Sequence, residues 1–334
     1  MRGPKGEGAR MNLRLAALLM AAAFLAAPAV EAQPPGKLPR IGILVPMAPP
    51  PPVTAQLELM LQGLRELGYE DGKTATFEVR YGANEPERVA NMAAELVRLQ
   101  VAVIWTLGDL STRAAQRATT TIPIVANVGF PVESGFVASL ARPGGNITAV
   151  SVLADELGRK RLELLKQALP KMTRVAFLWD TALNERQLRA TEAGAKALGL
   201  QLQVLSLRAP EDLPEAFESA ARGRSGGLSV AVSPMLSGSR DAVVALAAKH
   251  RISTMYSNRE FVDAGGLMSY GPHLAETSRL AAGLVEKILK GARPADLPVL
   301  QASKFDLIIN LKTAKALGLK LPQSLVQRAD QVIE

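Results

Sequence analysis

Hydroxyl-bearing and aromatic residues of this 334-residue chain follow short apolar runs, at the points where strands are expected to end. Thr106 and Ser233 stand beside expected helix starts, whose free N–H groups and dipole favour a carboxylate. Trp179, Tyr256 and Tyr270 could stack against a ligand, although Trp179 would suit the core equally well. These residue types favour the noncovalent binding of a small carboxylate.

The sequence offers few groups for covalent or metal chemistry. It has no cysteine, which excludes disulfides, zinc–thiolate sites and thiol catalysis. Its two histidines, His250 and His273, have no partner at metal-ligand spacing, and there is no phosphate-binding loop or dinucleotide fingerprint. We therefore expect no metal and no cofactor. A two-lobed isomerase or racemase stays open as an alternative, with Asp109 and Asp180 as its facing carboxylates.

Short apolar runs alternate with amphipathic segments along residues 40–317, which indicates strands and helices in turn. This βαβ repetition predicts an α/β fold in which each half forms a doubly wound parallel sheet. Ligands of such sheets collect beyond the carboxyl ends of the strands. The expected strands are 40–45, 74–81, 101–105, 122–126, 174–179, 201–207, 227–232, 253–256 and the extended 299–309. The expected helices are 55–67, 85–99, 112–119 (capped by Asp109 or Ser111), 157–169, 186–198, 213–222, 240–250, 274–290 and 312–317.

A proline and two glycines mark the middle of the chain. Pro143 fixes its own φ, Gly144 and Gly145 permit conformations closed to other residues, and an apolar β-branched run follows. We interpret residues 141–150 as the first crossing between two lobes and residues 265–271 as a second, while a returning strand would give a third. The predicted lobes are residues 38–148 plus 271–300 and residues 149–270 plus 301–334, with the ligand between them.

The first 32 residues have the pattern of a signal peptide. Arg10 and Arg14 precede an apolar run over 15–27, and a small residue, Ala32, ends the segment. The alternative, an uncleaved membrane anchor, needs about 20 apolar residues, and this run is shorter. We expect cleavage near Ala32, a periplasmic protein and no membrane insertion afterwards.

The charge pattern argues against a nucleic-acid partner. The formal net charge is +8, yet lysines and arginines are spread among acidic residues without a basic run or interleaved aromatics. Such a distribution is typical of a solvated surface.

Several strings together resemble the ABC transporter substrate-binding protein family of the tryptophan and tyrosine type. They are residues 63–69 (GLRELGY), 122–125 (IPIV), 139–148 (SLARPGGNIT), 160–165 (KRLELL), 259–262 (REFV), 265–271 (GGLMSYG) and 309–318 (INLKTAKALG). The resemblance spans essentially the whole mature chain. It implies a type I periplasmic binding fold, two lobes on a three-segment hinge, that closes on an amino acid or carboxylate and presents it to a permease. We expect a monomer that binds without catalysis.

Site residues carried over from the resemblance join those of the expected loops. The predicted ligand-binding residues are Met47, Thr106, Gly108, Asp109, Phe130, Pro131, Trp179, Asn184, Ser233, Tyr256 and Tyr270. Two features depart from the family pattern, because prolines occupy 49–52 and Phe130 stands where relatives carry an aspartate. An aromatic ring there favours an apolar or aromatic acid. A sugar-sensing transcription regulator of similar architecture would instead need a helix-turn-helix before the first strand, where this chain has its leader.

Overall fold

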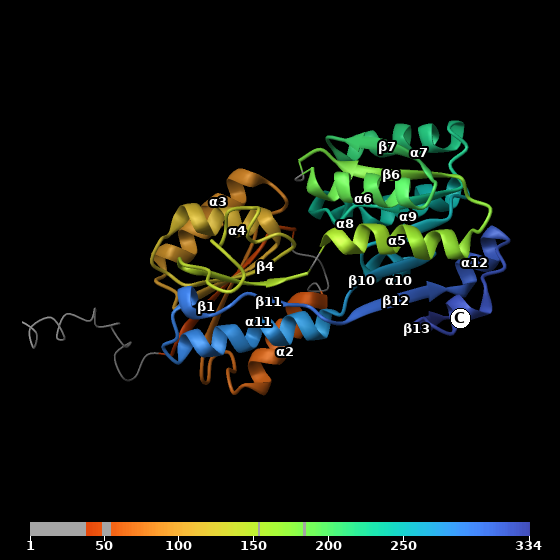
Figure 1. Ribbon diagram of the computed structural model, residues 1–334. Coiled ribbons are helices and arrows are strands. Elements are labelled where there is room, and N and C mark those ends of the chain that lie inside the picture. Colours follow the sequence, from red (N-terminus) through yellow and green to blue (C-terminus); the bar gives the residue numbers. More distant parts are fainter. Residues whose placement is uncertain (1–37, 49–54, 153, 183–184) are drawn as a thin grey trace, which may run out of the picture. The chain divides into compact units, whose positions relative to one another are not determined.

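The computed structural model describes residues 38–48, 55–152, 154–182 and 185–334, which form two sheets flanked by helices (Figure 1). The expected leader, residues 1–32, lies outside the described residues. Within the described part, no helix is long and apolar enough to cross a bilayer.

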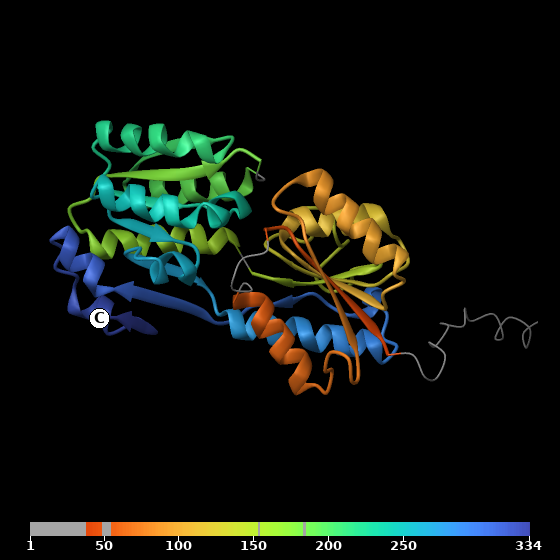
Figure 2. The same ribbon diagram turned by 180° about the vertical axis from the view of Figure 1, so that it is seen from behind.

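The first sheet is parallel, with the strand order β11-β5-β4-β3-β1-β2. Its strands are β1 (Arg40–Val45), β2 (Thr76–Tyr81), β3 (Val103–Leu107), β4 (Ile124–Val128), β5 (Ile147–Ser151) and β11 (Leu300–Gln301). One face packs on α2 (Ala55–Glu66) and α11 (Leu274–Leu289), which lie side by side although distant in sequence (Figure 2). The other face packs on α3 (Pro86–Arg98) and α4 (Gly108–Ala118). Buried β-branched and leucine side chains fill both layers, as a sheet covered on both sides requires.

The second sheet has the order β13-β12-β10-β9-β8-β6-β7. Its strands are β6 (Arg174–Asp180), β7 (Gln201–Leu207), β8 (Gly227–Val230), β9 (Thr254–Tyr256), β10 (Met268–Pro272), β12 (Phe305–Asn310) and β13 (Gln331–Ile333). The covering helices are α5 (Ala154–Ala168) and α6 (Arg186–Ala197) on one face, and α7 (Leu213–Arg222), α9 (Arg240–Lys249) and α10 (Arg259–Asp263) on the other. Shorter pieces are η1 (Pro210–Asp212), α8 (Pro234–Gly238), η2 (Pro294–Asp296), α12 (Leu311–Leu317) and α13 (Gln323–Val326).

One strand pair departs from the expected parallel arrangement. β10 and β12 are antiparallel, with Met268 opposite Ile309. The reason is the direction from which the chain returns: β11 ends at the carboxyl edge of the first sheet, so β12 enters the second sheet from its carboxyl edge.

The first link between the sheets follows Ser151, later than residues 141–150, where the sequence placed it. All five residues of β5 pair with β4, and Val150 also pairs with β11. The proline–glycine turn therefore leads into β5 within the first sheet, and Gly144 supplies the positive φ of +81° that this turn needs.

Three described segments connect the sheets, and each leaves a strand at its carboxyl end: Val152 after β5, His273 after β10, and 302–304 after β11. The segments are bonded to one another and to the strand ends. His273 N donates to the Lys304 carbonyl (2.9 Å), and Ala302 N donates to the Ser151 carbonyl (2.9 Å).

Glu276, in the first turn of α11, ties two of these segments together. Its carboxylate accepts hydrogen bonds from the N–H groups of Ser303 (3.1 Å) and Lys304 (2.8 Å) and from the Ser303 hydroxyl (2.6 Å). Burial alone would raise the pKa of this carboxyl, but these bonds lower it below its ordinary value.

Candidate functional site

The corner between β3 and α4 is held by threonine hydroxyls. Thr106 is fully buried, and its Oγ1 lies 2.7 Å from Oγ1 of Thr112. Thr112 also donates to the carbonyl of Gly108 (2.8 Å), where α4 begins with a φ of +79°. Glycine suits this backbone conformation. Thr106 therefore shapes the corner, and its hydroxyl is already engaged.

Asp109 lies in the first turn of α4 but caps nothing, which contradicts the expected capping role. The cap position belongs to Leu107, and Ser111 Oγ donates back to the Leu107 carbonyl (2.6 Å). The exposed Asp109 carboxylate accepts one hydrogen bond, from Ser134 Oγ (2.9 Å). Enough protein surrounds it that desolvation raises its pKa, although Ser134 and Arg113 act in the opposite direction.

The loop after β4 makes a charged contact with α6. The guanidinium of Arg186 lies 5.0 Å from the centre of the Phe130 ring and 2.8 Å from a Glu133 carboxylate oxygen. Pro131 is buried, and its carbonyl accepts a hydrogen bond from Phe136 N (2.9 Å). A cation thus already lies over Phe130, at the position that the sequence assigned to an apolar ligand.

Asp180 and Ser233 join the ends of β6 and β8. Ser233 Oγ donates to Asp180 (2.5 Å) and accepts from Leu236 N (3.2 Å), which caps α8. The other Asp180 oxygen accepts from Ala182 N (2.9 Å). Both side chains are buried. Asp180 is thus a structural acceptor, whereas Asp109 is accessible, so the two carboxylates do not form a matched pair.

Aromatic residues of the predicted site divide by burial. Trp179 packs in the core with its ring 6.0 Å from that of Phe177. Tyr256 is fully buried and stacks on Phe261 (4.8 Å). Tyr270 is only half-buried, and its ring lies 6.0 Å from Phe305.

Burial raises the pKa of the Tyr256 hydroxyl, and Thr254 lowers it by less. The Thr254 hydroxyl donates to the Ile252 carbonyl (3.1 Å), and Tyr256 Oη has no hydrogen-bond partner among the described residues. Of the remaining predicted residues, Met47 packs against the core of the first sheet, and Asn184 lies outside the described residues.

Sequence reasoning missed a set of buried polar atoms without hydrogen-bond partners, most of which belong to residues in or just after the carboxyl-terminal parts of strands. In the described part of the chain they belong to Asn84, Trp105, Asn127, Arg161, Tyr256 and Ser257, with His250 alone at the other edge. An unmet buried polar group costs about 1–3 kcal/mol, so each needs a ligand, an ordered water or another explanation. Asn127 was the member with a visible signal, as a polar residue within an apolar strand.

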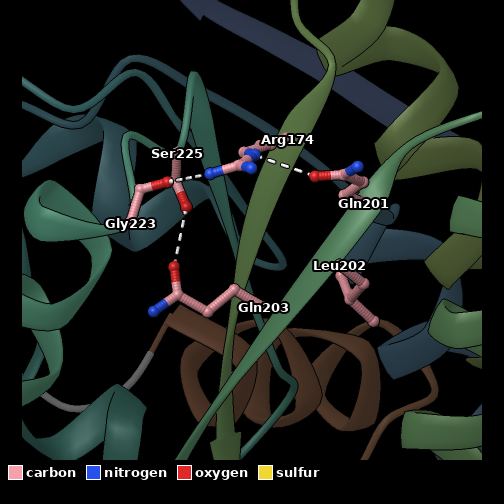
Figure 3. Close-up of a pocket in the computed structure, with 6 residues that line it drawn as sticks. All are labelled: Arg174, Gln201, Leu202, Gln203, Gly223 and Ser225. Atoms are coloured by element: carbon pink, nitrogen blue, oxygen red, sulfur yellow. Dashed lines mark hydrogen bonds between the residues drawn. The ribbon is translucent and has the colours of Figure 1, made fainter.

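A hollow of about 240 Å³ lies at the opposite edge of the second sheet, where β6 and β7 begin (Figure 3). Its polar groups bond to one another: Arg174 Nε donates to Gln201 (2.8 Å), and Ser225 Oγ donates to Gln203 (3.0 Å). Residues 223–227 match the Gly-x-Ser-x-Gly pattern of a catalytic serine. That motif requires a strand-to-helix turn, whereas Ser225 leads from α7 into β8.

The described residues offer no cluster of metal-binding side chains. No group of three or more histidine, aspartate or glutamate side chains stands close enough to hold a metal ion there.

Known proteins resemble this chain along most of its length. A curated tyrosine-binding protein of Clostridioides difficile is 27% identical over 264 residues, which is 78% of this chain and 75% of that protein. A conserved domain protein of Vibrio cholerae matches with a TM-score of 0.82 and 24% identity, over 89% of this chain and 100% of the other. An ABC domain of Streptococcus pneumoniae in complex with L-Trp matches with a TM-score of 0.80 and 23% identity, over the same shares.

These neighbours confirm the expected fold of two α/β lobes of the type I periplasmic binding class. The family model described as "ABC transporter substrate binding protein" matches residues 40–333. Its members bind a small solute and work with an ABC permease. The chain therefore belongs to the ABC transporter substrate-binding protein family.

Proposed function

We propose that the protein captures an amino acid or related carboxylate at the carboxyl edges of its two sheets and passes it on unchanged. The observation that carries this proposal is the set of buried, unpartnered polar atoms on residues near those edges, together with Arg161 of α5, which bonds to the carbonyl of Tyr270. The tyrosine-binding relative and the L-Trp complex support an aromatic amino acid as the first ligand to test.

The proposed ligand contacts are Asp109, Phe130 and Tyr270, the predicted residues that combine accessible surface with a carboxylate or an aromatic ring. The other predicted residues support the loops that present them. They are Met47, Thr106, Gly108, Pro131, Trp179, Ser233 and Tyr256, whereas Asn184, also a predicted contact, lies outside the described residues.

Closure of the lobes about the three linking segments would bury the solute. We place the lobes close to the predicted bounds, with the first link moved to follow Ser151. The bonds from Glu276 to Ser303 and Lys304 hold two links together, so the lobes would turn as rigid bodies about this joint. A ligand that prefers the closed form shifts the population toward it.

Export, a cleaved leader near Ala32 and a monomeric mature protein complete the proposal. The different environments of Asp109 and Asp180 support binding without turnover. An isomerase or racemase would need both groups free to exchange protons, and the buried Asp180 holds two hydrogen bonds.

A thermal-shift screen followed by calorimetric titration tests this function. The probes are L-tyrosine, L-tryptophan, L-phenylalanine, 3-phenylpropionate and tyramine. We expect at least one amino acid to raise Tm and to bind with a Kd near micromolar, about −8 kcal/mol, and to be recovered with its configuration unchanged. Racemised or otherwise converted probe, or no shift with any of them, would contradict the proposal.

A further inference from the structure

Arg161 is a buried cation on the face of α5 that packs against the second sheet. Its side chain is 2% exposed. Nε donates to the carbonyl of Tyr270 in β10 (2.7 Å), whereas Nη2 is buried without any hydrogen-bond partner. The guanidinium thus satisfies one strand carbonyl and keeps a free donor inside the protein.

No carboxylate compensates this charge among the described residues. Desolvation lowers the pKa of Arg161 to about 10, and the Tyr270 hydroxyl is the one ionisable group that acts in the opposite direction. A buried charge without a partner is costly, and proteins normally pair it. An anion from outside the chain would supply the missing partner.

A second free polar group lies beside the same strand. Ser257 follows directly on β9, is 1% exposed, and its hydroxyl also lacks a partner. A Cβ on Gly271 would stand 2.1 Å from the Ser257 carbonyl oxygen, so the Ser257 backbone touches β10 one residue beyond Tyr270.

Strand geometry turns the Ser257 side chain toward α5. β9 pairs with β10 at Met255 and Tyr256 only, with Met268 and Ser269 opposite them. Met255 belongs to the core cluster that includes the buried leucines of α5, and Tyr256 belongs to the other cluster. Because side chains alternate along an extended chain, Ser257 returns to the α5 side, where Arg161 reaches Tyr270.

We propose that Arg161 and Ser257 form a seat for the carboxylate group of the bound solute. The inference rests on the proposed function and assigns one end of its ligand to the second lobe. The Nη2–H and Oγ–H groups both donate, and a carboxylate offers two acceptor oxygens and the single negative charge that the guanidinium lacks.

Acetate tests the seat without the rest of the ligand. Sodium acetate replaces sodium chloride at constant ionic strength while Tm is followed for the wild type, Ser257→Ala, Arg161→Met and the control Ser229→Ala. Ser229 is a buried serine of neighbouring β8, opposite Met255 and farther from the edge. We expect acetate to stabilise the wild type and Ser229→Ala and to bind Ser257→Ala about tenfold more weakly, since one hydrogen bond to a charged group is lost.

Arg161→Met should lose the acetate response altogether while folding normally, because it removes a charge that the fold leaves unpaired. If this variant does not fold, Ser257→Ala decides the question alone. An equal acetate response in Ser257→Ala and wild type would overturn the seat, as would no response in wild type.

L-Tyrosine and tyramine separate this inference from the proposed function. If L-tyrosine binds, Ser257→Ala should weaken it about tenfold and leave tyramine, which has no carboxylate, unchanged. Tight binding of L-tyrosine that is indifferent to Ser257→Ala would overturn the seat and keep the proposed function. If acetate stabilises the protein but no amino acid binds, the carboxylate site at Arg161 and Ser257 would stand, and the proposal of an amino acid ligand would be wrong.

Discussion

The two edges of the second sheet differ in how their polar groups are satisfied. At the amino edge, the hollow of Figure 3 is lined by side chains that bond to one another, such as Arg174 with Gln201. At the carboxyl edge, Arg161 and Ser257 are buried and keep donors without partners. A hollow alone therefore does not identify a binding site, because its polar groups can already be hydrogen-bonded to one another. Unmet polar groups are a stronger sign that something else binds there.

The largest loss of stability should come from a steric clash at the carboxyl edge of the second sheet, where the pairing of β9 with β10 ends. Gly271→Ala would place a methyl group 2.1 Å from the Ser257 carbonyl, so the backbone must shift. We expect a loss of about 3 kcal/mol in unfolding free energy by urea denaturation. Gly145→Ala is the control, because a Cβ there meets nothing within 4 Å and its φ is not positive. A stable Gly271→Ala protein would show that this edge is loosely packed.

A second prediction compares the loss of stability on removing the buried carboxylate of Asp180 with that on removing the accessible carboxylate of Asp109. Asp180→Ala removes the acceptor of the buried Ser233 hydroxyl and of Ala182 N, which should cost about 2–3 kcal/mol of stability. Asp109→Ala should stay within about 0.5 kcal/mol of wild type, because its carboxylate is exposed and accepts a single, exposed hydrogen bond from Ser134. Urea unfolding of both variants measures the contrast. Equal losses would remove the distinction between a structural and a free carboxylate.

The linking segments give a prediction about pH. The folded-state pKa of Glu276 lies below its ordinary 4.5, so its stabilising bonds are complete above that pH and are lost as pH falls through the folded value. Glu276→Gln should therefore lower stability by about 1 kcal/mol near neutral pH and flatten the decline of stability below pH 4.5. Unfolding measured across this range tests the claim, and parallel pH curves for the two proteins would refute it.

The smallest effect is expected at the contact between the loop after β4 and α6. Glu133 and Arg186 form an ion pair with an N–O distance of 2.8 Å, and each side chain is 41% exposed. Because exposed ion pairs contribute little, Glu133→Gln should change the free energy of unfolding by less than about 0.5 kcal/mol. Ligand affinity at low and high salt is the informative readout. A change larger than tenfold would assign this pair a direct part in ligand capture.

The sequence predicted most elements because burial repeats with the period of each one. Strand 201–207 and helix 213–222 match β7 and α7, since apolar spacing and glycine or proline stops define both ends. The link after Ser151 was misplaced because the glycines at 144 and 145 resemble a crossing, although pairing with β4 continues beyond them. Strand pairing is a tertiary property that no local pattern reveals.

The candidate site was less predictable for a related reason. Loop positions could be read from strand ends, and Asp109 does lie directly after β3 with accessible surface, whereas Tyr270, also partly accessible, lies within β10 rather than in a loop. Thr106 and Ser233 carry suitable hydroxyls, but the structure uses them in internal bonds. Arg161 lies within an ordinary amphipathic helix pattern. That its Nη2 has no hydrogen-bond partner depends on which residues surround it in the folded protein, and the sequence alone does not show this.

Calorimetric titration of Ser257→Ala and Ser225→Ala beside the wild type tests the central claim most directly. The probe is whichever of L-tyrosine, L-tryptophan and L-phenylalanine raises the wild-type Tm most. The account predicts that Ser257→Ala, at the carboxyl edge, weakens binding about tenfold, while Ser225→Ala, in the hollow at the amino edge, leaves the Kd unchanged. Weaker binding in Ser225→Ala together with wild-type affinity in Ser257→Ala would contradict it.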